Sequence, residues 1–255
     1  MIAIHLALLA TIGLMIGSFL NVCIARLPAG ESIVSPGSRC PSCRTAIRWY
    51  DNVPVLSYVI LGGRCRTCHV RISVRYPIVE LVTAGAFLLQ GVVVGPDPIL
   101  LGSRLLFTAI VIVLFGTDLD TQRLPNAVTI PGIAAGVILS VVTPLGWPAS
   151  VMGVILGGGV LLAVRWGWKA ATGVDGMGLG DVKMLAMVGA FLGWRAIPVV
   201  LFLSSVTGAL VGVGLAVAQK RSMQSRLPFG TFLALAAFAA SIVGDALVTW
   251  YVSLF

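Results

Sequence analysis

The chain has 255 residues, of which 58% are hydrophobic and only 10% are charged, and its mean hydropathy is +1.03. Soluble globular domains carry about a quarter of charged residues, so this composition excludes an ordinary water-soluble protein. The formal net charge of +8 is compatible with nucleic acid or with a membrane surface, and the positions of the basic residues distinguish between the two.

Eight apolar runs are candidate membrane spans, because a helix needs about 20 mostly apolar residues to cross a bilayer. In chain order they cover residues 3–25, 77–94, 99–117, 127–143, 149–168, 182–194, 197–218 and 229–252. The sixth is too short to span unless its neighbours help. The first has no basic residue before it and no small-x-small exit site, so we interpret it as a span and not as a signal peptide. The sequence predicts an all-α, polytopic membrane helical bundle of about eight transmembrane helices.

The basic residues predict the orientation, because loops rich in Lys and Arg stay in the cytoplasm. With both termini outside, all of the 17 Lys and Arg residues except Arg104 and Arg195 lie on the cytoplasmic side. This topology and the attraction of anionic headgroups account for the net charge. The expected partners therefore include membrane lipid and no nucleic acid.

The predicted chain has two domains. Residues 1–94 hold the first span, a cytoplasmic loop at about 27–76 and the second span; residues 95–255 hold the remaining spans. Four cysteines of the loop form two C-x-x-C pairs, Cys40 with Cys43 and Cys65 with Cys68. Two such pairs predict a zinc site of four thiolates, which would stabilise a loop that has little core of its own.

Other uses of these cysteines are less favoured. Cys65 to His69 also match the C-x-x-C-H pattern of haem attachment, but haem would require this loop outside and would leave Cys40 and Cys43 unused. Disulfides are disfavoured because the cytosol keeps thiols reduced. The fifth cysteine, Cys23, is interpreted as a packing residue near the inner end of the first span.

Carboxylates beside membrane spans are functional candidates, because they are costly to place there. Asp118 and Asp120 follow the third span in the segment 118–126, and Asp181 opens the sixth span in the segment 176–183. The predicted topology puts both segments on the cytoplasmic side, where two carboxylates could form a dyad that shares a proton. In such a dyad one acid activates water and the other polarises a carbonyl.

The glycines of the second segment have a mechanical interpretation. Gly178 and Gly180 could permit unusual backbone angles and the close approach of a peptide substrate. The alternative is that Asp181 is only the N-cap of the sixth span. Asp245, in the outer half of the last run, is expected to make an interhelical hydrogen bond or to be partly protonated.

Three blocks, taken in order, resemble the bacterial type IV prepilin peptidases, which are G-x-G-D aspartyl membrane proteases. They are GSFLNV at 17–22 with RLP at 26–28; the double C-x-x-C loop with WYDNVPVLSY at 49–58 and RYPIVEL at 75–81; and DLDTQRLPN at 118–126 with GLGDVK at 178–183. Beyond about residue 210 no motif is found.

The resemblance implies a bifunctional enzyme of the bacterial inner membrane. It would remove the leader of type IV prepilins, or of the pseudopilins of type II secretion, at the cytoplasmic face after a glycine. It would then methylate the new N-terminus with S-adenosylmethionine. By motif, the catalytic residues would be Asp118 and Asp181, and the zinc ligands Cys40, Cys43, Cys65 and Cys68. The site would be supported by Asp120, Gly178, Gly180 and Lys183. Only the position of Asp118 before Leu124-Pro125 favours it over Asp120 as the first catalytic acid.

The site for the methyl donor must be unusual, because the chain has no Gly-rich strand-to-helix turn of the soluble nucleotide-binding type. Glu80 and Asn21, near the inner ends of the first two spans, are expected to help bind the cofactor or the substrate amine. The alternative is that Glu80 pairs with Arg75 and that Asn21 links two helices.

Three other functions compete. A presenilin-like intramembrane protease also uses a G-x-G-D segment, but the cysteine loop argues against it. A transporter or assembly factor would use Asp118, Asp181 and Asp245 to line an ion path. The third is a redox protein carrying zinc or haem.

Overall fold

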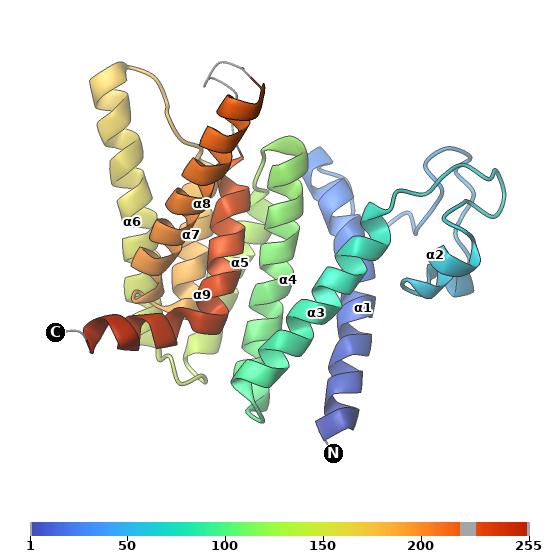
Figure 1. The fold of residues 1–255 in the computed structure, drawn as a ribbon, viewed down its shortest axis with the longest axis horizontal. Coiled ribbons are helices and arrows are strands. Elements are labelled where there is room, and N and C mark those ends of the chain that lie inside the picture. Colours follow the sequence, from blue (N-terminus) through green and yellow to red (C-terminus); the bar gives the residue numbers. More distant parts are fainter. Residues whose placement is uncertain (1, 220–227, 254–255) are drawn as a thin grey trace. The chain divides into compact units, whose positions relative to one another are not determined.

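The computed structural model describes residues 2–219 and 228–253, and each of the eight apolar runs forms an α-helix in it (Figure 1). These helices are α1 (Ile2–Arg26), α3 (Arg75–Val94), α4 (Pro98–Thr121), α5 (Asn126–Ser140), α6 (Trp147–Thr172), α7 (Leu179–Leu192), α8 (Ala196–Gln219) and α9 (Phe229–Val252). The described residues contain no β-strand, only two isolated bridges. The predicted all-α class is confirmed. The predicted role of the Asp245 side chain and much of the basic loop at 219–228 lie outside what is described.

The number of membrane spans is a different matter from the number of helices. Five described helices are long and apolar enough to cross a bilayer, while α5 and the described part of α9 are shorter apolar helices. Helix α7 has 14 residues, so at 1.5 Å per residue it is about 21 Å long and falls short of a hydrocarbon core of about 30 Å. The expected count of about eight spans is therefore not confirmed.

The chain divides into two compact units, Met1–Asp97 and Pro98–Phe255. In the first, α1 packs on α3 through glycines four residues apart. A Cβ added to Gly13 would lie 2.6 Å from the Cα of Ala84, and one added to Gly17 would lie 2.7 Å from the Cα of Glu80. This spacing of small residues lets membrane helices approach closely.

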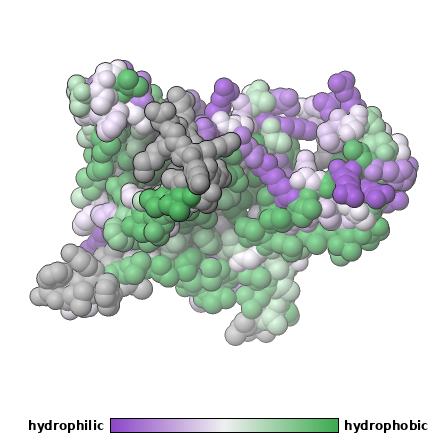
Figure 2. Space-filling model, turned by 45° about the horizontal axis from the view of Figure 1, so that its top comes forward, coloured by the Kyte–Doolittle hydropathy of each residue, from purple (hydrophilic) through white to green (hydrophobic). Residues whose placement is uncertain are grey.

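The loop between α1 and α3 contains two 3-10 turns, η1 (Leu27–Ala29) and η2 (Trp49–Asn52), and the short helix α2 (Leu56–Ile60). In Figure 2, hydrophilic side chains gather on this loop, whereas hydrophobic ones cover much of the helical surface that the view shows. The loop therefore has the surface of a water-exposed segment joined to membrane helices.

Helix α7 lies at the centre of the second unit and contacts α4, α5, α6, α8 and α9. Its residues Met184, Leu185, Met187, Val188 and Ala190 are all fully buried. A helix with apolar residues on every side is stable only away from water, either among other helices or in lipid. The short α7 is thus shielded by its neighbours, which hold its first turn in place.

Glycines bring α6 and α7 into backbone contact. A Cβ added to Gly153 would lie 2.2 Å from the carbonyl oxygen of Gly189, and one added to Gly157 would lie 2.5 Å from that of Leu185. The Ser150 hydroxyl donates a hydrogen bond of 2.8 Å to the Ala190 carbonyl. Small residues at such an interface increase van der Waals contact, which stabilises helix pairs in an apolar solvent.

This contact predicts the effect of one methyl group. Gly153→Ala should lower the free energy of unfolding by about 1–3 kcal/mol, because the helices must separate to admit the Cβ. Gly159→Ala is the matched control, since a Cβ there meets nothing within 4 Å, and it should leave stability unchanged or raise it by up to about 1 kcal/mol. Thermal unfolding of the purified protein in detergent measures both, and equal melting temperatures would contradict the packing described.

Candidate active site and metal centre

Asp118 lies in the last turn of α4 and is 5% exposed. Its Oδ2 accepts two hydrogen bonds from Thr231 near the start of α9, from the backbone N–H at 2.6 Å and from the hydroxyl at 3.0 Å. A buried carboxylate requires such donors, because leaving it unpaired in an apolar environment is costly. The pair also joins the end of α4 to the beginning of α9.

Asp120 has a different environment. It is exposed, as is its neighbour Leu119, because residues two apart on a helix point to nearly opposite sides. The interior position of Asp118 supports it as the functional carboxylate of this segment.

Gly230 allows the close approach of α9 to Asp118. A Cβ added there would lie 2.9 Å from the Cγ and Oδ2 of Asp118 and 3.1 Å from the Leu124 side chain. Leu124 also faces Gly180, where an added Cβ would lie 2.9 Å from the Leu124 Cβ. Leu124 therefore packs beside Gly230, which lies next to Asp118, and beside Gly180, which precedes Asp181.

Asp181 is the third residue of α7, whose N-cap is Gly178. The alternative that Asp181 is itself the N-cap is therefore wrong. Its carboxylate turns back toward the N-cap, since a Cβ added to Gly178 would lie 3.4 Å from the Asp181 Oδ2. The third residue of a helix has this position in a capping box.

The two glycines beside Asp181 do not adopt the unusual angles expected for them. Gly178 has φ −72° and ψ 144°, which any residue can adopt, and Gly180 lies within α7. What Gly180 does provide is space, because its missing side chain leaves room for Leu124. The close approach of a peptide substrate to these glycines stays a prediction.

The structure brings the two aspartate segments together. The carboxylates of Asp118 and Asp181 are near enough for the charge of one to act on the other. Lys183 donates a hydrogen bond of 2.7 Å from Nζ to Oδ1 of Asn126, the first residue of α5. This bond ties the segment after Asp118 to the first turn of α7.

Sequence reasoning missed Gly230 and Thr231, because no motif was recognised beyond about residue 210. A weak signal was present, since Pro228, Gly230 and Thr231 stand at the start of an apolar run. A glycine and a hydroxyl residue at such a place are also common helix-start residues. Only their distance to Asp118 shows their relation to the site.

The four loop cysteines converge on one point. All four Sγ atoms lie within 4.8 Å of one another, with 3.8 Å between Cys40 and Cys68 and 4.0 Å between Cys43 and Cys65. Tetrahedral zinc with bonds of about 2.3 Å requires sulfurs about 3.8 Å apart. The residues fit zinc, and His69 and Cys23 do not belong to the cluster.

The two C-x-x-C turns have the same local geometry. The N–H of Cys40 donates to Thr45 O at 3.0 Å, and the N–H of Cys65 donates to Val70 O at 2.9 Å. Arg44 and His69, which occupy the same position after each first cysteine, have φ of 57° and 56°. Hydrogen bonds from Thr45 lower the pKa of the Cys43 thiol to about 6. The thiolate that results is the form that binds metal.

An ion pair joins the second turn to the rest of the loop. Arg66 donates from Nε and Nη2 to the two carboxylate oxygens of Asp51, at 2.8 and 2.6 Å. This bidentate pair lowers the pKa of Asp51. Together with the cysteines, it connects η2 to a segment 15 residues further along the chain.

Asn21 and Glu80 are buried and hold the first unit together. Asn21 Nδ2 donates to Gly17 O at 3.2 Å and to Tyr76 O at 3.1 Å, so Asn21 links α1 to α3. Glu80 Oε2 accepts the N–H of Val55 at 2.8 Å, just before α2. A role in cofactor binding stays a prediction.

An all-helical membrane protein with two neighbouring aspartates and a four-cysteine loop has the architecture of a membrane aspartyl peptidase. Residues 11–94 match the model of the bacterial peptidase A24 N-terminal domain, and residues 105–213 match that of the type IV leader peptidase family. The chain belongs to the type IV leader peptidase family.

Curated relatives agree over nearly the full length. A protein of Aeromonas salmonicida (strain A449) named prepilin leader peptidase/N-methyltransferase is 37% identical, over 98% of this chain and 94% of its own. A protein of Pseudomonas putida with the same name is 40% identical, over 95% and 92%. No solved structure matches.

The Thr231 hydroxyl should matter for activity as well as for packing. Thr231→Val keeps the backbone donor but removes the hydroxyl donor, so peptidase activity should fall roughly 10-fold or more, as for loss of a hydrogen bond to a charged group. Thr231→Ser should retain activity. Initial rates on a peptidase substrate measure the effect, with Thr207→Val in α8 as a control for loss of an exposed hydroxyl. Equal rates in all three variants would contradict the assignment.

Cys40→Ser should reduce zinc content and loosen the loop, because three thiolates close a structural site poorly. Cys23→Ala, a buried cysteine outside the cluster, should leave the zinc content unchanged. Elemental analysis of the purified protein measures both. Full zinc content in Cys40→Ser would show that the ligands are wrongly assigned.

Proposed function

We propose that this protein is a membrane aspartyl endopeptidase that removes the leader of type IV prepilins or pseudopilins after a glycine at the cytoplasmic face, and then N-methylates the new N-terminus. The observation that carries the proposal is the meeting of Asp118 and Asp181 in a chain of this family. Membership makes the protein a prepilin peptidase with N-methyltransferase activity, acting in the inner membrane.

The two aspartates have the arrangement that acid-base hydrolysis needs. Two nearby carboxylates do not both ionise readily, so they share a proton. One carboxylate takes a proton from water as the water attacks the peptide carbonyl, and the other acid donates its proton to the carbonyl oxygen. Both of the Thr231 bonds engage Oδ2 of Asp118, which restrains the carboxylate and leaves Oδ1 outside these two bonds.

The residues around the pair act as supports. Leu124, packed against Gly180 and Gly230, supplies apolar surface that limits water near the carboxyl groups. Lys183 and Asn126 hold α7 against α5. Asp120, exposed in the same turn of α4, would influence the pair through its charge.

The cytoplasmic location is supported by the basic loops, which stay inside. The loop with the cysteines carries Arg39, Arg44, Arg48, Arg64, Arg66 and Arg71. Zinc held by Cys40, Cys43, Cys65 and Cys68 would have a structural role, since four thiolates leave no open coordination position for substrate. S-adenosylmethionine would supply the methyl group, and the residues described assign no step of that transfer.

The other candidate functions are not favoured. The four-cysteine loop and the near-complete match to prepilin peptidases oppose a presenilin-like protease and a transporter. Convergence of all four cysteines opposes haem attachment through Cys65 and Cys68.

Asp118→Asn or Asp181→Asn should lower cleavage by about 10²–10⁴-fold, the usual contribution of a general acid or base, while the protein still folds, because Asn keeps the side-chain shape. The purified protein in detergent is incubated with a prepilin and S-adenosylmethionine, and product masses are read. The wild type should give loss of the leader and gain of one methyl group.

Asp120→Asn is the matched control, since it removes a carboxylate two residues from Asp118 and should cleave at nearly the wild-type rate. Cleavage by either of the other variants at the wild-type rate would remove that residue from the dyad. Melting temperatures of all three variants show whether a loss of activity reflects unfolding.

A further inference from the structure

A hydrogen bond connects the residue before helix α2 to a side chain within α3, beyond the first residue of α3. Glu80 accepts the N–H of Val55 at 2.8 Å. It stands five residues after Arg75, the first residue of α3, which is about 7.5 Å along the helix. Figure 1 shows α2 level with the first turns of α3. Since α3 is a candidate span, we infer that the membrane boundary lies near its first turns, at the level of α2.

The bond to Glu80 supports a costly turn. Val55 has φ 59° and ψ −50°, a conformation that β-branched residues rarely adopt because it is strained. Val55 is the N-cap of α2, so the strained residue stands directly before the first residue of this helix. The position of α2 beside α3 is therefore set by a specific contact with a buried carboxylate.

One side of α2 is apolar and uncovered. Leu56, Val59 and Ile60 are 61%, 69% and 77% exposed, and residues at i, i+3 and i+4 share one helical face. The other side faces the loop, where Ser57 donates to Tyr50 O at 3.0 Å and the Tyr58 hydroxyl bonds Ile72 O at 3.4 Å. Three large apolar side chains at the depth of the boundary suit lipid better than water.

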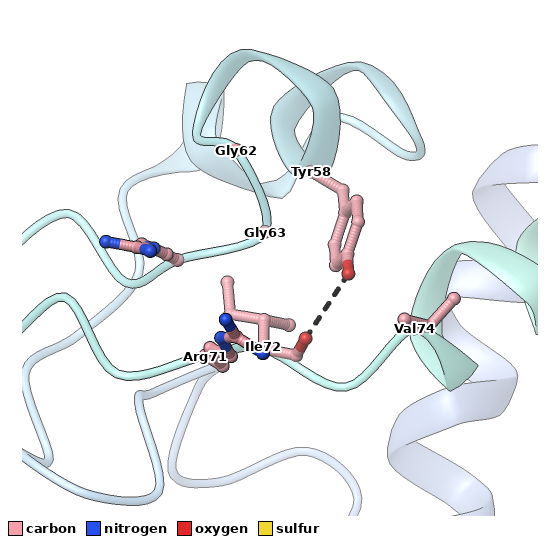
Figure 3. A pocket seen from close by; sticks show the side chains of 7 residues that line it. Tyr58, Gly62, Gly63, Arg71, Ile72 and Val74 are labelled. Carbon is pink, nitrogen blue, oxygen red and sulfur yellow. Dashed lines mark hydrogen bonds between the residues drawn. The ribbon is translucent and has the colours of Figure 1, made fainter.

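Two arginines beside α2 lack an acidic partner. Arg64 and Arg71 stand opposite each other in an antiparallel bridge, where like charges repel. Both are exposed, and neither forms an ion pair with the described residues. They line a cavity of about 270 Å³ together with Tyr58 and Ile72, and Figure 3 shows Tyr58 reaching across it from α2 to Ile72.

An apolar face beside an unneutralised pair of arginines complements an anionic phospholipid. Arginine binds phosphate oxygens in a fork of parallel hydrogen bonds, and acyl chains would cover the exposed side of α2. The loop is joined to α1 and α3 at its two ends. Because both helices are candidate spans, the loop stays close to the bilayer surface.

We propose that α2 and the turn carrying Arg64 and Arg71 form an anionic phospholipid site at the cytoplasmic membrane surface. Leu56, Val59 and Ile60 lie among the acyl chains, and the cavity beside them takes the headgroup phosphate. This site is independent of the aspartate pair and anchors the zinc loop to the bilayer.

The test uses the full chain with zinc bound, reconstituted in nanodiscs of phosphatidylcholine with or without phosphatidylglycerol. An environment-sensitive fluorescent amino acid replaces Ile60, or Thr67 at the tip of the second C-x-x-C turn as a control. Lipids brominated on their acyl chains should quench the probe at 60 several-fold more than the probe at 67. Equal quenching at the two positions would overturn the insertion of α2.

The arginines are tested in the same nanodiscs. Phosphatidylglycerol should increase quenching at 60, and Arg64→Gln with Arg71→Gln should abolish that increase. Arg39→Gln with Arg44→Gln, which removes the same charge from the other C-x-x-C turn, should retain it. The site would be overturned if both pairs of substitutions removed the increase in quenching equally. It would also be overturned if inorganic phosphate, added to pure phosphatidylcholine nanodiscs, gave the same increase in quenching. Zinc content and melting temperature confirm that the variants are folded, and the quenching at 60 in the chain with its arginines intact tests insertion by itself.

Discussion

Carboxyl groups can stand inside an apolar helical bundle only where the protein supplies their hydrogen-bond donors. Asp118 has the backbone and the hydroxyl of Thr231 near the start of α9, and the Asp181 carboxylate lies beside Gly178, the N-cap of α7. Backbone N–H groups at helix starts have no partner within the helix, so they are available to carboxylates. The site is therefore built where the beginnings of α7 and α9 meet the end of α4.

Glycine makes these meetings possible. Gly230 and Gly180 admit Asp118 and Leu124, and Gly153 and Gly189 let α6 and α7 touch backbone to backbone. With no hydrophobic effect to drive helices together in lipid, such close contact is a main source of attraction. A short helix like α7 can then carry a polar residue at its first turn while its remaining turns are buried.

The loop of the first unit is stabilised by bonds between specific side chains and not by a hydrophobic core. It has few buried side chains, so four thiolates and the Arg66–Asp51 pair provide connections that a core would otherwise provide. Glu80 and Asn21 connect the loop and the start of α3 to the helix pair through buried hydrogen bonds. Polar residues that resemble cofactor ligands in the sequence thus have a structural task in the fold.

The sequence by itself determined the helical class, the positions of the apolar helices and the cysteine cluster. Hydrophobic runs and C-x-x-C spacing are local patterns, and the physical requirement behind each acts within one segment. It also indicated Asp118 and Asp181 as a pair by motif. Only the tertiary structure decided that Asp118 faces inward while Asp120 faces outward, that Gly178 and not Asp181 caps α7, and that Thr231 supports Asp118 from 113 residues away. These features depend on which helix faces meet, and helix contact is set by side chains distant in the chain, so no single segment encodes it.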